Sequence, residues 1–189
     1  MDVVVIDPPA DLIAERQRLG LDHHDEVWDG DYHMVPAASG EHQRTILRLA
    51  MSLVPIVEAA GLEVLTEWNL IPIGEPGWND FRVPDLIVFP PSIRHDRGAI
   101  GAASLVIEIR SPGDESFEKL PFYERLGVGE VLVIDRDTKA VRRWVSGTDG
   151  LVESVGDGAG RHELDCLPVE LWNEDTTLVV LTDGVRTEI

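Results

Sequence analysis

The stretch SLVIEIRSPGD, residues 104–114, begins as a run of aliphatic side chains and ends in a turn signal. Such a short apolar run is typical of a central strand that is covered on both faces. One acid, Glu108, interrupts it. A buried carboxylate is costly unless it is paired or bound to a metal ion, so Glu108 is the first candidate functional residue.

The segments around this strand also have clear patterns. A long helix is predicted from about 40 to 60, because Ser39 can cap its first turn, and Pro55 predicts a kink or break inside it. The other elements predicted here are a strand at 62–73, a loop at 74–80, a short strand at 84–89, a helix at 115–126, and strands at 130–134 and 140–145. A helix between two strands implies a right-handed parallel crossover, and the earlier strands favour an antiparallel meander. The prediction is a mixed α/β (α+β) fold with the core order helix, three strands, helix, strand.

Three segments make up the predicted chain. Residues 1–25 are expected to be an N-terminal extension with a short helix, and residues 26–146 the core, which begins with a hairpin that turns at Asp29-Gly30. Residues 147–189 are expected to be acidic C-terminal strands packed on the same domain.

Charge is the strongest feature of the composition. The 189 residues include 35 Asp and Glu against 16 Lys and Arg, a net charge of −19, which argues against a protein that coats nucleic acid nonspecifically. Residues 1–31 and 150–189 each hold nine acids and two bases, so the middle is closer to balance. The single cysteine, Cys166, excludes an internal disulfide. Because neither a signal peptide nor a membrane span of ~20 apolar residues is visible, we expect a cytoplasmic location and no membrane partner.

Two acids on neighbouring strands suggest a metal site. Asp85 opens the short strand directly after Pro84, and adjacent strands lie ~4.8 Å apart, so its carboxylate and that of Glu108 could share one hard cation. The carbonyl of Ile109 lies near the same edge. Two carboxylates, one carbonyl and waters form a typical shell for Mg²⁺, with Mn²⁺ as a possible substitute.

Other polar residues could complete this site. Lys119 and Tyr123 share a helix face at i and i+4, and strand alternation places Arg110 on the same face as Glu108. Glu41, as a further metal ligand, and His42 are candidates from the first turn of the long helix. Each residue alone also has a structural explanation, such as a salt bridge from Glu108 to Arg110 or a solvated lysine at 119.

The order and spacing of these motifs resemble those of a known family. The segments at 82–88 and 105–112, Lys119 with Tyr123, and the segment at 127–135 are similar to the Uma-type bacterial family of restriction endonuclease-like proteins, over roughly residues 25–146. That family belongs to the PD-(D/E)XK nuclease superfamily.

The resemblance implies a fold and a set of roles. It implies a restriction-endonuclease-like core and a magnesium-dependent phosphodiesterase, with Pro84-Asp85 as the PD pair and Glu108 as the second acid. Arg110 replaces the usual lysine, and Lys119 on the next helix matches the lysine that takes its place in this family. Arginine stays charged at all working pH values, so Arg110 can hold phosphate but cannot act as a base.

The leading hypothesis is therefore a magnesium-dependent endonuclease that hydrolyses DNA phosphodiester bonds, with catalytic residues Asp85, Glu108, Lys119, Arg110 and Tyr123. A homodimer is possible, because duplex cleavage uses two sites related by a two-fold axis. The alternatives are an inactive nuclease fold that serves as an interaction module, and a hydrolase of RNA or another phosphoester. The candidate phosphate contacts are Arg94, His95, Arg97, Arg142 and Arg143.

Overall fold

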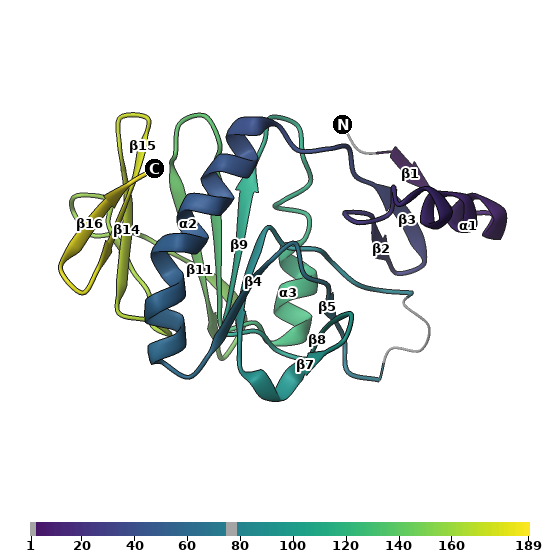
Figure 1. The fold of residues 1–189 in the computed structure, drawn as a ribbon. Helices are drawn as coiled ribbons and strands as arrows, with labels where there is room; N and C mark the ends of the chain where they lie inside the picture. The colour runs from purple at the N-terminus through teal and green to yellow at the C-terminus, as the bar shows by residue number, and fades with distance from the viewer. Residues whose placement is uncertain (1–2, 75–78) are drawn as a thin grey trace.

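A mixed sheet of six strands forms the centre of the protein in the computed structural model, which describes residues 3–74 and 79–189 (Figure 1). The strand order is β12-β11-β10-β9-β6-β4. The strands of this sheet are β4 (Glu63–Thr66), β6 (Leu86–Phe89), β9 (Leu105–Arg110), β10 (Glu130–Asp135), β11 (Val141–Gly147) and β12 (Gly150–Ser154).

The pairing of these strands confirms the predicted topology. β9 and β10 are parallel, and the helix α3 (Leu120–Leu126) connects them. β4, β6 and β9 form the predicted antiparallel meander. The helix α2 (Gly40–Ala59) precedes the meander, and the side chain of Ser39 accepts a hydrogen bond from the backbone N–H of His42 as its N-cap.

Helices cover the two faces of the sheet differently. Apolar residues of α2, such as Leu49 and Leu53, pack with one face of the sheet and with the C-terminal strands. Phe122 and Tyr123 of α3 pack on the opposite face with Val106. The strand β9 is therefore buried on both sides, as its apolar sequence predicted.

Several smaller sheets surround this core. The N-terminal part contains β1 (Val3–Val5), α1 (Ala10–Leu19), β2 (Glu26–Trp28) and β3 (Asp31–Met34), and Figure 1 shows it at the end of the molecule away from the C-terminus. A second sheet contains β5 (Leu70–Ile71), β7 (Arg94–His95) and β8 (Gly98–Ile100). The C-terminal sheet contains β13 (His162–Glu163), β14 (Val169–Glu174), β15 (Thr177–Thr182) and β16 (Val185–Glu188).

Some predicted boundaries are wrong. The expected strand at 62–73 is two strands in different sheets, because Glu67 adopts a positive φ of 52° that ends β4. The expected helix at 115–126 begins only at Leu120, since the Asp114 carboxylate accepts the backbone N–H groups of Ser111 and Ser116, and residues 116–119 form turns. α2 continues through Pro55, which is exposed, so water can bond the carbonyl that lacks a donor. In the predicted loop at 74–80, residues 75–78 lie outside the described part.

Candidate active site

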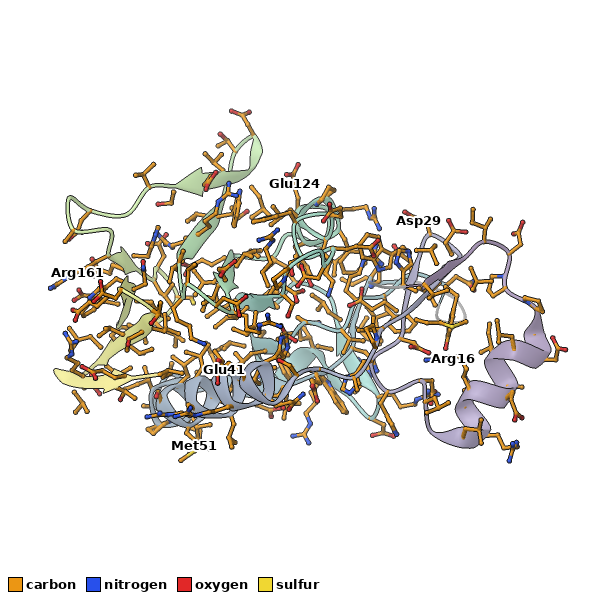
Figure 2. The ribbon with its side chains drawn as sticks, turned by 90° about the horizontal axis from the view of Figure 1, so that it is seen from above. Arg16, Asp29, Glu41, Met51, Glu124 and Arg161 are labelled. Atoms are coloured by element: carbon orange, nitrogen blue, oxygen red, sulfur yellow. The ribbon has the colours of Figure 1, made fainter. Side chains whose placement is uncertain are left out.

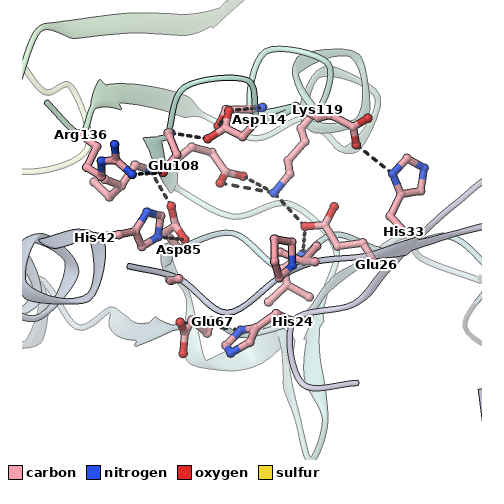
Figure 3. A pocket seen from close by; sticks show the side chains of 18 of the residues that line it. His24, Glu26, His33, His42, Glu67, Asp85, Glu108, Asp114, Lys119 and Arg136 are labelled. Atoms are coloured by element: carbon pink, nitrogen blue, oxygen red, sulfur yellow. Dashed lines mark hydrogen bonds and ion pairs between the residues drawn. The ribbon is translucent and has the colours of Figure 1, made fainter. Parts of the chain in front are cut away.

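A cavity of about 350 Å³ lies between the hairpin β2–β3, the start of α2 and the ends of β6 and β9 (Figure 3). Titratable side chains make up half of its lining residues. They are His24, Glu26, His33, His42, Glu67, Asp85, Glu108, Asp114, Glu115, Lys119 and Arg136.

Asp85 lies just before β6, and its carboxylate contacts both β9 and α2. Its Oδ2 accepts a hydrogen bond of 2.6 Å from the backbone N–H of Ile109, and its Oδ1 lies 2.9 Å from Nε2 of His42. The N–H and C=O of one strand residue point to the same side, so the Ile109 carbonyl also faces toward Asp85. Burial acts to lower the pKa of His42. The hydrogen bond to Asp85 and the nearby carboxylates together outweigh burial, so the pKa lies above its ordinary value.

Glu108 lies in the middle of β9 and is 2% exposed. The hydroxyl of Tyr123 donates a hydrogen bond to its Oε1, and Nζ of Lys119 lies 3.2 Å from the same oxygen. Burial, helped by the nearby Asp85 and Glu26 carboxylates, raises the pKa of Glu108 to about 8 in spite of Lys119. Asp85, Glu108 and Lys119 therefore line one cavity, as predicted, whereas Tyr123 contacts Glu108 without lining the cavity.

Lys119 is shared between two buried carboxylates. Its Nζ lies 2.8 Å from Oε1 of Glu26 and 3.2 Å from Oε1 of Glu108 (Figure 3). Burial acts to lower the pKa of Lys119, but these two carboxylates outweigh it and raise the pKa above its ordinary value. The ammonium thus stays protonated at working pH and supplies positive charge, so it cannot act as a base.

Sequence reasoning missed Glu26, which is 2% exposed on β2. Besides Lys119, it accepts hydrogen bonds from the indole N–H of Trp28 at 2.7 Å and from the backbone N–H of Val83 at 2.8 Å. The sequence carries no comparable signal for it, because Glu26 follows Asp25 in a polar hairpin and does not interrupt an apolar run as Glu108 does. Through Glu26, the β2–β3 hairpin contributes a buried carboxylate to the site.

Two residues that were expected in the site, Glu41 and Arg110, lie outside the cavity lining. Glu41 is half exposed on α2 (Figure 2), and its Oε1 lies 3.2 Å from Nζ of Lys139, so it does not line the cavity. Arg110 pairs with Asp135 at 3.5 Å, because the parallel register places these two residues side by side, and it too is outside the cavity lining. The expectations that both join the site are corrected accordingly.

Most of the expected phosphate contacts are already engaged. Arg142 pairs with Glu153 at 2.7 Å, and the buried Arg143 pairs with Glu130 at 2.7 Å. Arg94 lies 3.3 Å from Glu63. The cavity instead contains Arg136, which sequence reasoning did not select. It follows β10, and its Nη1 lies 3.4 Å from Oγ of Ser111.

The raised pKa of Glu108 predicts a pH dependence of stability in the absence of divalent cations. Between its usual value of 4.5 and about 8, folded Glu108 keeps a proton that the unfolded chain releases. Its contribution is complete below the lower value and is lost as the pH rises through the upper one. We expect the unfolding free energy of the wild type, relative to Glu108→Gln, to fall between pH 5 and pH 8 in urea titrations with EDTA. A difference that does not change with pH would contradict the assignment.

The donor set suits a hard divalent cation. No group of three or more His, Cys, Asp or Glu side chains arranged for a metal occurs among residues 3–74 and 79–189. Asp85 and Glu108 nevertheless supply two carboxylates near the Ile109 carbonyl, and Mg²⁺ commonly uses one or two carboxylates and completes its shell with water. The mutual repulsion of the two carboxylates is a cost that a cation would remove.

The protein is thus an α/β protein whose mixed sheet gathers two carboxylates and a buried lysine in one cavity, the arrangement that the resemblance to restriction-endonuclease-like proteins implied. The match to known families agrees: residues 14–179 match Uma2, described as "Putative restriction endonuclease", and the chain belongs to this family. Curated proteins provide no match. Within the described residues, no helix is long and apolar enough to cross a membrane.

A solved structure supports the fold. A protein of Anabaena variabilis, described as "a putative nuclease belonging to DUF820", is similar with a TM-score of 0.57 and 20% sequence identity. The similarity covers 71% of this chain and 77% of the other. At this identity, the likeness concerns the fold alone.

Proposed function

We propose that this protein is a magnesium-dependent nuclease that hydrolyses DNA phosphodiester bonds. The observation that carries the proposal is the meeting of Asp85, Glu108 and Lys119 in one cavity, from segments well separated in the chain. Family membership supports the same class of reaction.

In this proposal, Asp85, Glu108 and the Ile109 carbonyl hold the cation. When bound, it would supply positive charge to the phosphoryl oxygens and lower the pKa of a nearby water. Tyr123 holds the Glu108 carboxylate in place by its hydrogen bond, and His42 does the same for Asp85. These contacts restrict the two carboxylates to one arrangement, which favours a defined site.

Lys119 has the electrostatic role. Hydrolysis joins a water oxygen to phosphorus, breaks the bond to the leaving oxygen, and transfers one water proton to that oxygen. Negative charge builds up on the phosphoryl group during this step, and a preorganised ammonium in a water-poor site stabilises it strongly. Because the pKa of Lys119 is raised, the ammonium keeps its charge throughout.

The direct test is cleavage of labelled DNA oligonucleotides, single-stranded and duplex, in Mg²⁺ or Mn²⁺. We expect cleavage that stops when EDTA removes the cation and returns when Mg²⁺ is restored. Cleavage of RNA alone would identify the substrate alternative. Failure to cut any nucleic acid, with Mn²⁺ bound according to calorimetry, would indicate the non-enzymatic nuclease fold and reject the proposal.

His42 provides a test of positioning. His42→Ala removes the 2.9 Å partner of Asp85 without removing a carboxylate, so we expect cleavage to weaken about 10- to 100-fold through looser cation binding. The apparent Mg²⁺ requirement should rise, and excess Mg²⁺ should restore part of the rate. Arg48→Ala, farther along the same helix and outside this cavity, is the control. An unchanged Mg²⁺ requirement in His42→Ala would contradict the role.

A further inference from the structure

The charges around the cavity limit what can enter it. Besides three histidines, its described lining includes two basic side chains, Lys119 and Arg136. Lys119 lies deep, with a side chain that is 14% exposed and already contacts two carboxylates. Arg136 is more accessible, with its side chain 23% exposed, and pairs with the exposed Asp137. Lys119 and Arg136 thus give the cavity permanent positive charge at two points, one deep and one near the surface.

Acidic groups surround these two points. Glu67, Asp114 and Glu115 line the same cavity, and Figure 3 shows Glu67 and Asp114 on different sides of it. The N-terminal part, which contributes the β2–β3 hairpin to the cavity, belongs to a segment with nine acids and two bases over residues 1–31. A nucleic-acid strand that placed many phosphates along this side of the cavity would be repelled by these carboxylates.

Most of the other basic side chains already form ion pairs with carboxylates. Carboxylates lie within 4.0 Å of at least 12 of the 14 Lys and Arg residues other than Lys119 and Arg136. Each contact of such a residue with a nucleic-acid backbone would compete with an existing ion pair. Binding along a duplex depends on many phosphate contacts with release of counterions, so this surface is poorly suited to it.

The reacting groups lie below the surface. Glu108 is 2% exposed, and the side chain of Asp85 is 17% exposed. A scissile phosphodiester must therefore enter the cavity, whose volume of about 350 Å³ lies near the lower end for small-ligand sites, roughly 300–1,000 Å³.

We propose, on the basis of the nuclease function above, that the site takes a short substrate with one or two phosphates, such as a 5′-phosphorylated dinucleotide or the end of a single strand. The scissile phosphodiester lies near Lys119, and Arg136 binds the second phosphate. An internal segment of duplex is not the substrate. Arg136 is then a substrate-binding residue that the sequence motifs do not include.

The test measures binding in Ca²⁺, with product analysis to verify that the probes stay intact. The probes are a labelled 5′-phosphorylated dinucleotide, a single-stranded tetranucleotide and a 24-base-pair duplex, each at 50 and 200 mM NaCl. We expect the two short probes to bind with similar Kd and to weaken less than about 10-fold at the higher salt, because two phosphate contacts give a slope of only about −1.4. Arg136→Met should weaken both at least 5-fold, whereas Arg186→Met, at an exposed ion pair outside the cavity, should not.

Two results would overturn the inference. One is a duplex that binds at least 10-fold tighter than the short probes and loses about 1,000-fold at 200 mM NaCl, as expected for six or more phosphate contacts. The other is binding of none of the probes. Short probes that bind as expected but stay uncut in Mg²⁺ would support the recognition and reject the proposed hydrolysis, so the two claims fail separately.

Discussion

Glu108→Gln is expected to lose DNA cleavage by more than about 100-fold, since even the outer hydrogen-bond partners of metal ligands are worth 10- to 100-fold. The amide keeps the size of the side chain but removes the negative charge that would hold the cation. Initial rates of oligonucleotide cleavage at saturating Mg²⁺, together with Mn²⁺ affinity by calorimetry, measure the change.

The fold should survive this substitution. Lys119 keeps its 2.8 Å contact with Glu26, so the ammonium retains a charged partner. The variant also removes the repulsion between Glu108 and Asp85 that helps to raise the pKa of Glu108. We expect a melting temperature at pH 8 equal to or above that of the wild type. Glu163→Gln, at an exposed acid on β13, is the matched control and should change neither property. Cleavage retained in Glu108→Gln would refute the assigned site.

Glu26→Gln is expected to have the largest effect on stability. The Glu26 carboxylate accepts from Trp28, Val83 and Lys119, and an amide NH₂ group would face one of these donors. Removing one partner of a buried ion pair costs about 3–5 kcal/mol. We expect a loss of this size in the unfolding free energy from urea titrations at pH 7. Cleavage should weaken as well, because Lys119 then keeps only the contact with Glu108.

A double-mutant cycle separates the ion pair from the other contacts of Glu26. Lys119→Met removes the ammonium, so Glu26→Gln in that background no longer removes an ion-pair partner of Lys119. We expect the two substitutions together to cost clearly less than the sum of their separate costs. Strict additivity would show that the contribution of Glu26 to the unfolding free energy does not depend on its ion pair with Lys119.

The site is partly visible in the sequence. Glu108 and Asp85 stand out because a strand of aliphatic residues and a Pro-Asp pair are local patterns, and Lys119 with Tyr123 follows from helical spacing. Glu41 and His42 could not be told apart in this way. Successive helix positions turn by about 100°, so only one of the two faces the cavity, and the docking of α2 decides which.

Arg110 shows a second limit of local patterns. Strand alternation assigns it to the same side as Glu108, but alternation does not say which neighbour a long side chain will meet. Asp135 stands opposite it in the parallel register, and the ring of Phe117 lies 5.1 Å from its guanidinium carbon, so both hold it away from the cavity.

The sequence by itself determined the order of the core elements and two acids of the site, Asp85 and Glu108, because hydrophobic periodicity, caps and turns act between residues close in the chain. Only the tertiary structure decided that Glu26 shares Lys119 with Glu108 and that Arg136 borders the same cavity. Those contacts bring together the β2–β3 hairpin, the turns before α3 and the residue that follows β10. They depend on sheet register and on how the hairpin packs, which arise from interactions across the whole chain.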